Sequence, residues 1–242
     1  MCITCGCHPN DNNNSAKDIH TKTLSLEENI LKKNDDLANK NRVFFHDNNL
    51  ITLNLLSSPG SGKTTLLEKT LQILLTSQNC YVIEGDQHTD QDVMRIRATG
   101  AQAVQINTGK GCHLDAHHIQ HGNQELPIDD KGGYLFIENV GNLVCPASFD
   151  LGEDKKVVIL SVTEGDDKPI KYPDMFHAAD LMIINKIDLL PYVDFDITTC
   201  INHAHRINPL LHVIELSATS SAGIEKWLQY LSELKRNKFK HS

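Results

Sequence analysis

Short apolar runs recur along most of the chain, and stretches with helical periodicity separate them. Such runs occupy residues 50–56, 80–85, 101–106, 133–139, 156–162, 181–186 and 211–217. Runs of this length that are apolar on both faces are typical of buried parallel strands. The intervals between them are long enough for crossover helices, and residues 64–78 and 221–236 carry leucines at helical spacing. The pattern predicts a three-layer α/β fold, in which a mostly parallel sheet of about seven strands has helices on both faces.

The first part of the chain lacks this alternation. Residues 1–23 contain cysteines, a proline and a run of asparagines but few large apolar side chains, so we expect a short flexible tail. Residues 23–41 then place leucines and an isoleucine at helical spacing, and Ser25 with Glu28 resembles a capping box that starts a helix. The sequence therefore predicts a tail over 1–23 and one domain over 24–242.

Composition narrows the class of partner. The chain has 242 residues and a formal net charge of −8, and this acidic balance argues against a surface that binds nucleic acid. No apolar run reaches the roughly 18 residues of a membrane span, and the N-terminus lacks the pattern of a signal peptide. We expect a cytoplasmic protein with no nucleic-acid partner and no membrane insertion.

Residues 55–64, with the sequence LLSSPGSGKT, predict a phosphate-binding loop. They meet the pattern G-x-x-x-x-G-K-[ST] except that Ser57 stands at the first glycine position. The loop follows an apolar run and opens a helix, an arrangement that directs backbone N–H groups at phosphate oxygens. In this geometry Lys63 contacts the terminal phosphates and the Thr64 hydroxyl binds Mg²⁺. The residues assigned to the phosphates are Pro59, Gly60, Ser61, Gly62, Lys63, Thr64 and Thr65.

A second motif indicates which base is bound. Asn185, Lys186 and Asp188 form the N-K-x-D pattern of guanine-specific NTPases. The Asp188 carboxylate can accept from the ring N1–H and the exocyclic amine of guanine, a pair of donors that adenine lacks. Ser217 and Ala218 are placed to close the base pocket from the other side. With the phosphate loop, these motifs predict a P-loop GTPase that hydrolyses GTP to GDP and phosphate.

Two acidic residues at strand ends are candidates for the magnesium site. Asp86 follows one apolar run, and Glu138 lies three residues before Gly141 in a DxxG-like element with Glu in place of Asp. Either carboxylate can bind Mg²⁺ directly or through water, and capping a helix is the alternative role. No glutamine follows Gly141 to orient a water, so we expect slow intrinsic hydrolysis. The predicted catalytic residues are Lys63, Thr64, Asp86 and Glu138.

Cysteine and histidine gather in two places that suit a softer metal. Cys2, Cys5 and Cys7 form a C-x-x-C-x-C pattern at the start of the chain. Thiolates and imidazoles suit Ni²⁺, Zn²⁺ or copper ions and are poor ligands for Mg²⁺. We predict a metal-binding tail, and a reversible disulfide between two of these thiols is the alternative.

The second group lies inside the predicted domain. Cys112 and His113 are adjacent, and Cys145 follows Gly141 in the segment that GTPases use as a switch. We expect these three ligands to hold a metal that senses the γ-phosphate through the segment beginning at Glu138. Three ligands leave an incomplete shell, which a symmetric second copy of the chain can complete.

Three more histidines follow on a predicted helix. His113, His117 and His121 are spaced to share one helical face, and His118 lies beside them. We interpret His117, His118 and His121 as solvent-facing in preference to further metal ligands.

Taken together, the phosphate loop, the sequence ENVGNLVCP, the Cys112–His113 pair and the sequence NKID resemble the HypB family of hydrogenase nickel incorporation GTPases. The resemblance covers residues 24–242 and the cysteine tail. It implies a SIMIBI-class GTPase that forms a homodimer with GTP and works with a zinc-containing maturation chaperone. It also implies nickel or zinc at Cys112, His113 and Cys145, and a nickel motif in the tail.

On this resemblance we expect GTP hydrolysis to drive insertion of Ni²⁺ into the precursor of the [NiFe] hydrogenase large subunit. The expected cofactors are GTP, Mg²⁺, Ni²⁺ and Zn²⁺. The urease accessory GTPase is one alternative, but its Cys-Pro-His motif differs from this chain, in which Ala147 follows Cys145 and Pro146. A nickel or zinc storage protein, whose nucleotide site only sets the oligomeric state, is the other.

Overall fold

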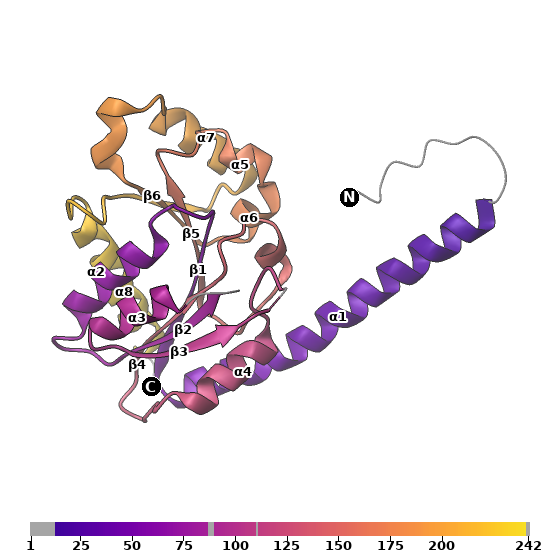
Figure 1. The fold of residues 1–242 in the computed structure, drawn as a ribbon, viewed down its shortest axis with the longest axis horizontal. Coiled ribbons are helices and arrows are strands. Elements are labelled where there is room, and N and C mark those ends of the chain that lie inside the picture. Colours follow the sequence, from indigo (N-terminus) through magenta and orange to yellow (C-terminus); the bar gives the residue numbers. More distant parts are fainter. Residues whose placement is uncertain (1–12, 87–89, 110, 241–242) are drawn as a thin grey trace. The chain divides into compact units, whose positions relative to one another are not determined.

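A parallel sheet of seven strands, in the order β3-β2-β4-β1-β5-β6-β7, forms the centre of the protein (Figure 1). The computed structural model describes residues 13–86, 90–109 and 111–240, with side chains from residue 28 onward. Each predicted apolar run coincides with one strand, which confirms the predicted three-layer α/β fold of the P-loop NTPase type. The strands are β1 (Leu50–Ser57), β2 (Cys80–Asp86), β3 (Gln102–Asn107), β4 (Gly133–Glu138), β5 (Lys155–Ser161), β6 (Leu181–Asn185) and β7 (His212–Glu215).

Helices cover both faces of this sheet. Because successive side chains of a strand point to opposite faces, each strand supplies two cores. Leu53 and Leu55 of β1 belong to the core shared with α2 and α8, whereas Leu56 belongs to the core shared with α6 and α7. The helices and 3₁₀ turns after the first helix are α2 (Lys63–Leu74), α3 (Gln91–Ala98), α4 (Ala116–Glu125), η1 (Cys145–Ser148), α5 (Lys168–Lys171), α6 (Pro173–Ala178), η2 (Ile187–Tyr192), α7 (Ile197–Ile207) and α8 (Ile224–Lys238).

The first helix, α1 (Asn13–Asp47), corrects the prediction of a helix over 23–41 at both ends. It runs through Ser25, so the proposed capping box does not mark its start. The chain divides into two units after Lys33. Cys2, Cys5 and Cys7 lie outside the described residues, and the predicted boundary at residue 23 stays a prediction.

Packing explains why α1 continues past the predicted end. Phe45 is 1% exposed and shares a core with Leu50 and Tyr81, whereas Val43 on the opposite side of the helix is 60% exposed. Burial of an aromatic ring against strand side chains stabilises the last turns of the helix, although residues 42–47 contain little helical signal of their own.

Buried asparagines attach the later part of α1 to the start of α4. The Nδ2 of Asn41 donates to the carbonyl oxygen of Ala116 at 2.8 Å. The Oδ1 of Asn34 accepts from the backbone N–H of Ala116 at 2.9 Å, and its Nδ2 donates to the carbonyl oxygen of Asp150. These bonds satisfy backbone groups that would otherwise be buried without partners.

Within the ranges that the structure describes, no helix combines the length and apolar character that a membrane crossing requires.

Substitution of Phe45 tests whether the end of α1 is part of the folded core. We expect Phe45→Ala to lower the free energy of unfolding by about 3–5 kcal/mol, because it removes a fully buried ring. Val43→Ala, at an exposed position of the same helix, should change it by less than about 0.5 kcal/mol. Urea unfolding followed by circular dichroism measures both, and equal effects of the two substitutions would contradict the packing described here.

Candidate functional site

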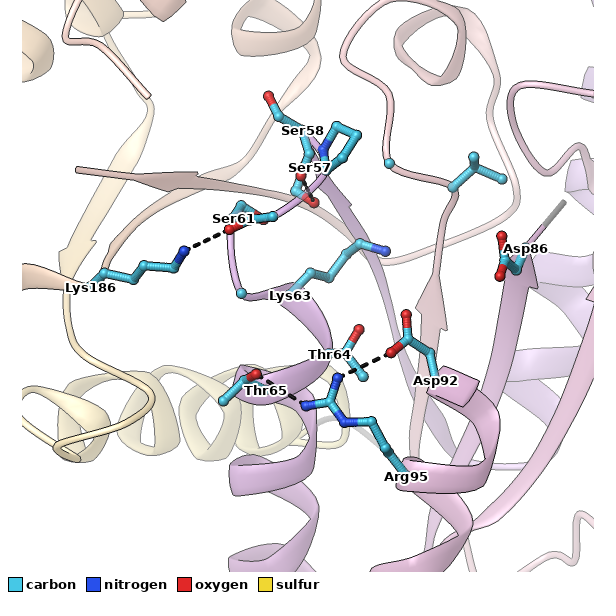
Figure 2. Close-up of a pocket in the computed structure, with 15 residues that line it drawn as sticks. Ser57, Ser58, Ser61, Lys63, Thr64, Thr65, Asp86, Asp92, Arg95 and Lys186 are labelled. Carbon is cyan, nitrogen blue, oxygen red and sulfur yellow. Dashed lines mark hydrogen bonds and ion pairs between the residues drawn. The ribbon is translucent and has the colours of Figure 1, made fainter. Parts of the chain in front are cut away.

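A cavity of about 610 Å³ opens at the carboxyl ends of the central strands (Figure 2). The loop between β1 and α2 and the first turn of α2 form one wall, and together they contain all of the predicted phosphate-binding residues. Gly62 has a φ of +90°, and a Cβ at this position would lie 2.6 Å from Nδ2 of Asn185. Glycine is therefore required here by the backbone conformation and by the close approach of the second motif. The other residues lining the cavity are Ser57, Ser58, Asp86, Asp92, Arg95, Val140, Gly141 and Lys186.

Asn185 joins the phosphate loop to the predicted base-binding residues. Its Nδ2 donates to the carbonyl oxygen of Ser61 at 2.9 Å. Its Oδ1 accepts from the backbone N–H groups of Lys186 and Ala218 at 2.8 and 3.1 Å. The Lys186 ammonium donates to the carbonyl oxygen of Gly60 at 2.6 Å, which holds the loop from the side of β6. One side chain thus brings together the three predicted nucleotide-binding segments.

The remaining base-pocket residues lie near this junction. Ser217 is fully buried, and its hydroxyl accepts from the backbone N–H of Ser220 at 3.0 Å. Asp188 is exposed in the first turn of η2. Its predicted contact with guanine stays a prediction.

Lys63, Thr64 and Glu138 form the oxygen-rich part of the site. The Thr64 hydroxyl donates to Oε1 of Glu138 at 2.6 Å, and the Lys63 ammonium lies 3.2 Å from the same oxygen. Glu138 is 1% exposed, and its Oε2 has no hydrogen-bond partner among the described residues. A buried carboxylate oxygen beside a hydroxyl group fits Mg²⁺, which prefers hard oxygen ligands. Asp86 lines the same cavity, so the predicted magnesium ligands lie at one edge of the sheet.

Sequence reasoning missed a second buried carboxylate at this edge. Glu84 of β2 is in register with Glu138 of β4 and is 3% exposed. Burial, together with the nearby Glu138 and Asp86 carboxylates, raises the pKa of Glu84 to about 8. The side chain therefore carries a proton at neutral pH. An acidic residue inside an otherwise apolar strand was the available signal.

Arg95 of α3 is also an unpredicted member of the cavity. Its guanidinium donates to the Thr65 hydroxyl at 3.2 Å and forms ion pairs with Glu68 and Asp92 (Figure 2 shows the contacts with Thr65 and Asp92). The guanidinium therefore lies beside the phosphate loop, where two carboxylates pair with its charge. No motif marks this position, because the arginine reaches the cavity through the packing of α3 against α2.

The three predicted internal metal ligands come together in the structure. One ligand atom each from Cys112, His113 and Cys145 lie within 4.8 Å of one another, and all three residues are half-buried. The His113 ring packs against the Phe149 ring at 4.0 Å between centroids, and Nδ2 of Asn142 donates to the carbonyl oxygen of Cys112 at 3.2 Å. Two sulfurs and one imidazole nitrogen fit Ni²⁺ or Zn²⁺ and would bind Mg²⁺ poorly.

The environment of these ligands affects their protonation. Burial lowers the pKa of His113, so the imidazole is neutral at pH 7 and has a nitrogen lone pair for a metal. Burial, and then the neighbouring Cys145 thiol, raises the pKa of Cys112. Metal binding at this cluster must therefore displace a thiol proton, which makes the affinity depend on pH.

The other histidines of this region do not join the cluster. Because α4 begins at Ala116, His113 precedes the helix, and the prediction that it shares a helical face with His117 and His121 is wrong. His117 and His121 are exposed, with ring centroids 4.6 Å apart. His118 instead forms a capping box with Asp115; burial alone would raise the pKa of this carboxyl, but the hydrogen bonds from His118 lower it to about 2.

Both the sequence and the fold of this chain are similar to those of one family of known proteins. Residues 51–215 match the CobW/HypB/UreG nucleotide-binding domain. The hydrogenase maturation factor HypB of Azotobacter vinelandii is 60% identical over 211 residues, which cover 87% of this chain and 69% of the relative. The crystal structure of HypB from Archaeoglobus fulgidus has a TM-score of 0.79 at 40% identity and covers 85% of this chain and 100% of its own. HypB from Helicobacter pylori, crystallised in complex with nickel, also has a TM-score of 0.79, at 38% identity, covering 87% and 99%.

Removal of one thiol tests the internal metal cluster. In a chain with Cys2, Cys5 and Cys7 replaced by alanine, we expect Cys145→Ala to lower Zn²⁺ affinity by about 100-fold or more, since loss of a direct ligand exceeds the effect of outer contacts. Zn²⁺ affinity before this substitution should fall as the pH is lowered from 8 to 6, because protons compete for the thiols. Competition with a chromophoric chelator measures both effects.

Cys200 provides the matched control, because it is a buried cysteine of α7 outside the cluster. Cys200→Ala should leave Zn²⁺ affinity unchanged. Retention of full affinity in Cys145→Ala would exclude Cys145 as a ligand.

Proposed function

The chain belongs to the HypB family of hydrogenase maturation factors, within the CobW/HypB/UreG nucleotide-binding proteins, and on this basis we propose that it is a GTP-hydrolysing nickel chaperone. In this proposal GTP hydrolysis drives release of Ni²⁺ from Cys112, His113 and Cys145. The ion is then inserted into the precursor of the [NiFe] hydrogenase large subunit. The membership confirms the family resemblance that the sequence motifs indicated.

One observation carries the proposal: a single segment contributes to both sites. Val140 and Gly141 line the phosphate cavity, and Cys145 of the same segment lies with Cys112 and His113. Metal affinity can depend on the nucleotide only if both the nucleotide and the metal contact a segment whose position differs between the nucleotide states. In this proposal, the segment over residues 140–145 meets this requirement. A storage protein has no need of this connection.

The chemistry of the phosphate site follows from the residues that line it. Mg²⁺, held by the Thr64 hydroxyl and the Glu138 carboxylate with Asp86 beside them, would neutralise charge that develops on the phosphates. Lys63 and the backbone N–H groups of the loop bind and orient the phosphate oxygens. The Arg95 guanidinium, which is paired with Glu68 and Asp92, holds the Thr65 hydroxyl beside this loop. Since no glutamine follows Gly141, we propose slow turnover without a partner.

Nickel is the cargo that we propose for this chain. The donor set of two thiols and an imidazole suits nickel or zinc, and a HypB relative of similar fold has been crystallised in complex with nickel. We propose that Cys2, Cys5 and Cys7 bind nickel as well.

The proposed partners follow from the incomplete metal shell and the family. We propose that two copies associate when GTP is bound, so that the partner copy supplies further ligands. A zinc-containing maturation chaperone and the hydrogenase precursor are the other partners. We place this activity in the cytoplasm, where a reducing environment keeps the metal-binding thiols free.

Base recognition can be tested at Asp188. We expect Asp188→Asn to lower GTP affinity by about 10–100-fold, because a charged hydrogen bond to the guanine donors is lost. The same substitution should raise affinity for xanthosine triphosphate, whose carbonyl oxygen replaces the exocyclic amine and can accept from the new amide. Fluorescence titration measures both nucleotides, and unchanged preference would exclude Asp188 from the base pocket.

Nickel affinity in the two nucleotide states tests the proposed function. In the chain with the three N-terminal cysteines replaced by alanine, we expect Ni²⁺ to bind about 5–150-fold more tightly with a non-hydrolysable GTP analogue than with GDP. Linkage requires Ni²⁺ to change the ratio of the affinities for the analogue and for GDP by the same factor, which provides an internal control. Equal affinities in both states, or no phosphate release with metal present, would favour a storage protein.

A further inference from the structure

One buried amide lies between the two sites. Asn139, the residue after β4, is 1% exposed. Its Oδ1 accepts from the backbone N–H groups of Leu114 and Val140, both at 3.0 Å, and its Nδ2 donates to Oδ1 of Asn54 at 3.3 Å. Leu114 directly follows the metal-ligating residues Cys112 and His113. The side chain of Asn139 is therefore attached to the loop that holds two of the three ligands.

The backbone of the same residue belongs to the phosphate site. The Lys63 ammonium donates to the carbonyl oxygen of Asn139 at 2.5 Å, in addition to its ion pair with Glu138. In a phosphate loop this ammonium group binds the terminal phosphates of the nucleotide. A bound triphosphate that draws the ammonium group toward itself would compete with the Asn139 carbonyl group for it.

Strand geometry explains how neighbouring residues reach different sites. Phe136 belongs to the core on the α2 side of the sheet, and Ile137 belongs to the core on the α4 side. Side chains continue to alternate at the strand end. Glu138 accordingly contacts Thr64 of α2, while Asn139 contacts Leu114 on the opposite face.

We propose that Asn139 is the positioning residue that transmits the nucleotide state to Cys112 and His113, which rests on the coupling in the proposed function. When a triphosphate binds the Lys63 ammonium group, the Asn139 carbonyl oxygen loses its hydrogen-bond donor. The peptide group between Asn139 and Val140 then shifts. The backbone N–H of Leu114 is buried beside the amide, and separation would leave it without a partner. Leu114 and the two ligands before it therefore follow the amide.

This coupling through a side chain differs from direct movement of the backbone between the phosphate cavity and Cys145. Movement of Val140 and Gly141 acts directly on Cys145, which lies further along the same segment. Asn139 acts on the ligands of the other loop, and the bond from Asn142 to the Cys112 carbonyl supports it. The proposal therefore predicts a response of the Cys112–His113 loop that depends on a single side chain.

The chain offers a matched control for Asn139. Asn34 is also a buried asparagine, and its Oδ1 accepts from the backbone N–H of Ala116, close to Leu114 in sequence. It holds this region from α1, and its side-chain hydrogen bonds to described residues go to Ala116 and Asp150, not to Lys63 or the phosphate loop. Asn139→Ala and Asn34→Ala each remove one buried acceptor beside the metal loop, but only Asn139→Ala cuts the connection to the phosphate site.

The experiment measures the ratio of Zn²⁺ affinities with a non-hydrolysable GTP analogue and with GDP, in full-length chains that carry alanine at Cys2, Cys5 and Cys7. We expect a ratio of about 5–150 without further substitution and in Asn34→Ala, and a clearly smaller ratio in Asn139→Ala, in which only the route through Cys145 remains. An undiminished ratio in Asn139→Ala would overturn the role of Asn139 and leave the proposed function standing. Equal affinities before any substitution in the domain would overturn both.

Hydrogen exchange provides a second measurement, and its first comparison uses the unsubstituted protein. In the metal-free, unsubstituted protein, the amide of Leu114 should exchange at a different rate with the GTP analogue than with GDP. The difference should persist in Asn34→Ala and disappear in Asn139→Ala. An identical rate with both nucleotides in the unsubstituted protein would contradict transmission through this bond.

Discussion

The contacts of Lys63 at the end of β4 are the interaction on which both sites depend. The ammonium group lies between the Glu138 carboxylate and the Asn139 carbonyl group, at the first turn of α2. One of these partners belongs to the expected magnesium site, and the other belongs to the residue that holds the metal loop. A phosphate that recruits this ammonium changes the environment of both partners at once. Among the described residues, no other lysine or arginine side chain has one partner in the magnesium site and another in the residue that holds the metal-binding loop.

The parallel sheet makes this arrangement possible. Parallel strands end at the same edge, so β1, β4 and β6 bring the phosphate loop, the Glu138 segment and Asn185 together although they are far apart in sequence. The alternation of side chains along β4 then separates the two kinds of metal ligand. Oxygen ligands face α2, whereas the thiols and the imidazole lie with the loops before α4 and after β4. Hard and soft metal ligands are thus kept apart by the sheet and connected by its backbone.

Features with a strong local signal were predictable from sequence. The buried strands were evident because both faces are apolar, and the phosphate loop and the N-K-x-D motif follow from residue chemistry at fixed spacing. The end of α1 was missed because Phe45 packs against strand residues, most of them distant in sequence. Ser25 resembled a cap because the capping pattern is purely local, whereas the helix runs through it. Glu84, Arg95 and Asn139 were missed for the same reason. Their roles arise from strand register, helix packing and a turn, which short sequence windows do not encode.

Magnitudes support a coupling based on a few hydrogen bonds. Allosteric coupling between two ligands is typically about 1–3 kcal/mol. A hydrogen bond to a charged group contributes about 1.5–3 kcal/mol, so exchange of the Lys63 bond from Asn139 to a phosphate is sufficient in size. A ligand can shift an equilibrium only by the difference in its interactions with the two states. GDP lacks the terminal phosphate that would compete most directly for Lys63. In the proposed mechanism, this difference lets hydrolysis weaken the binding of the metal without any contact between nucleotide and ion.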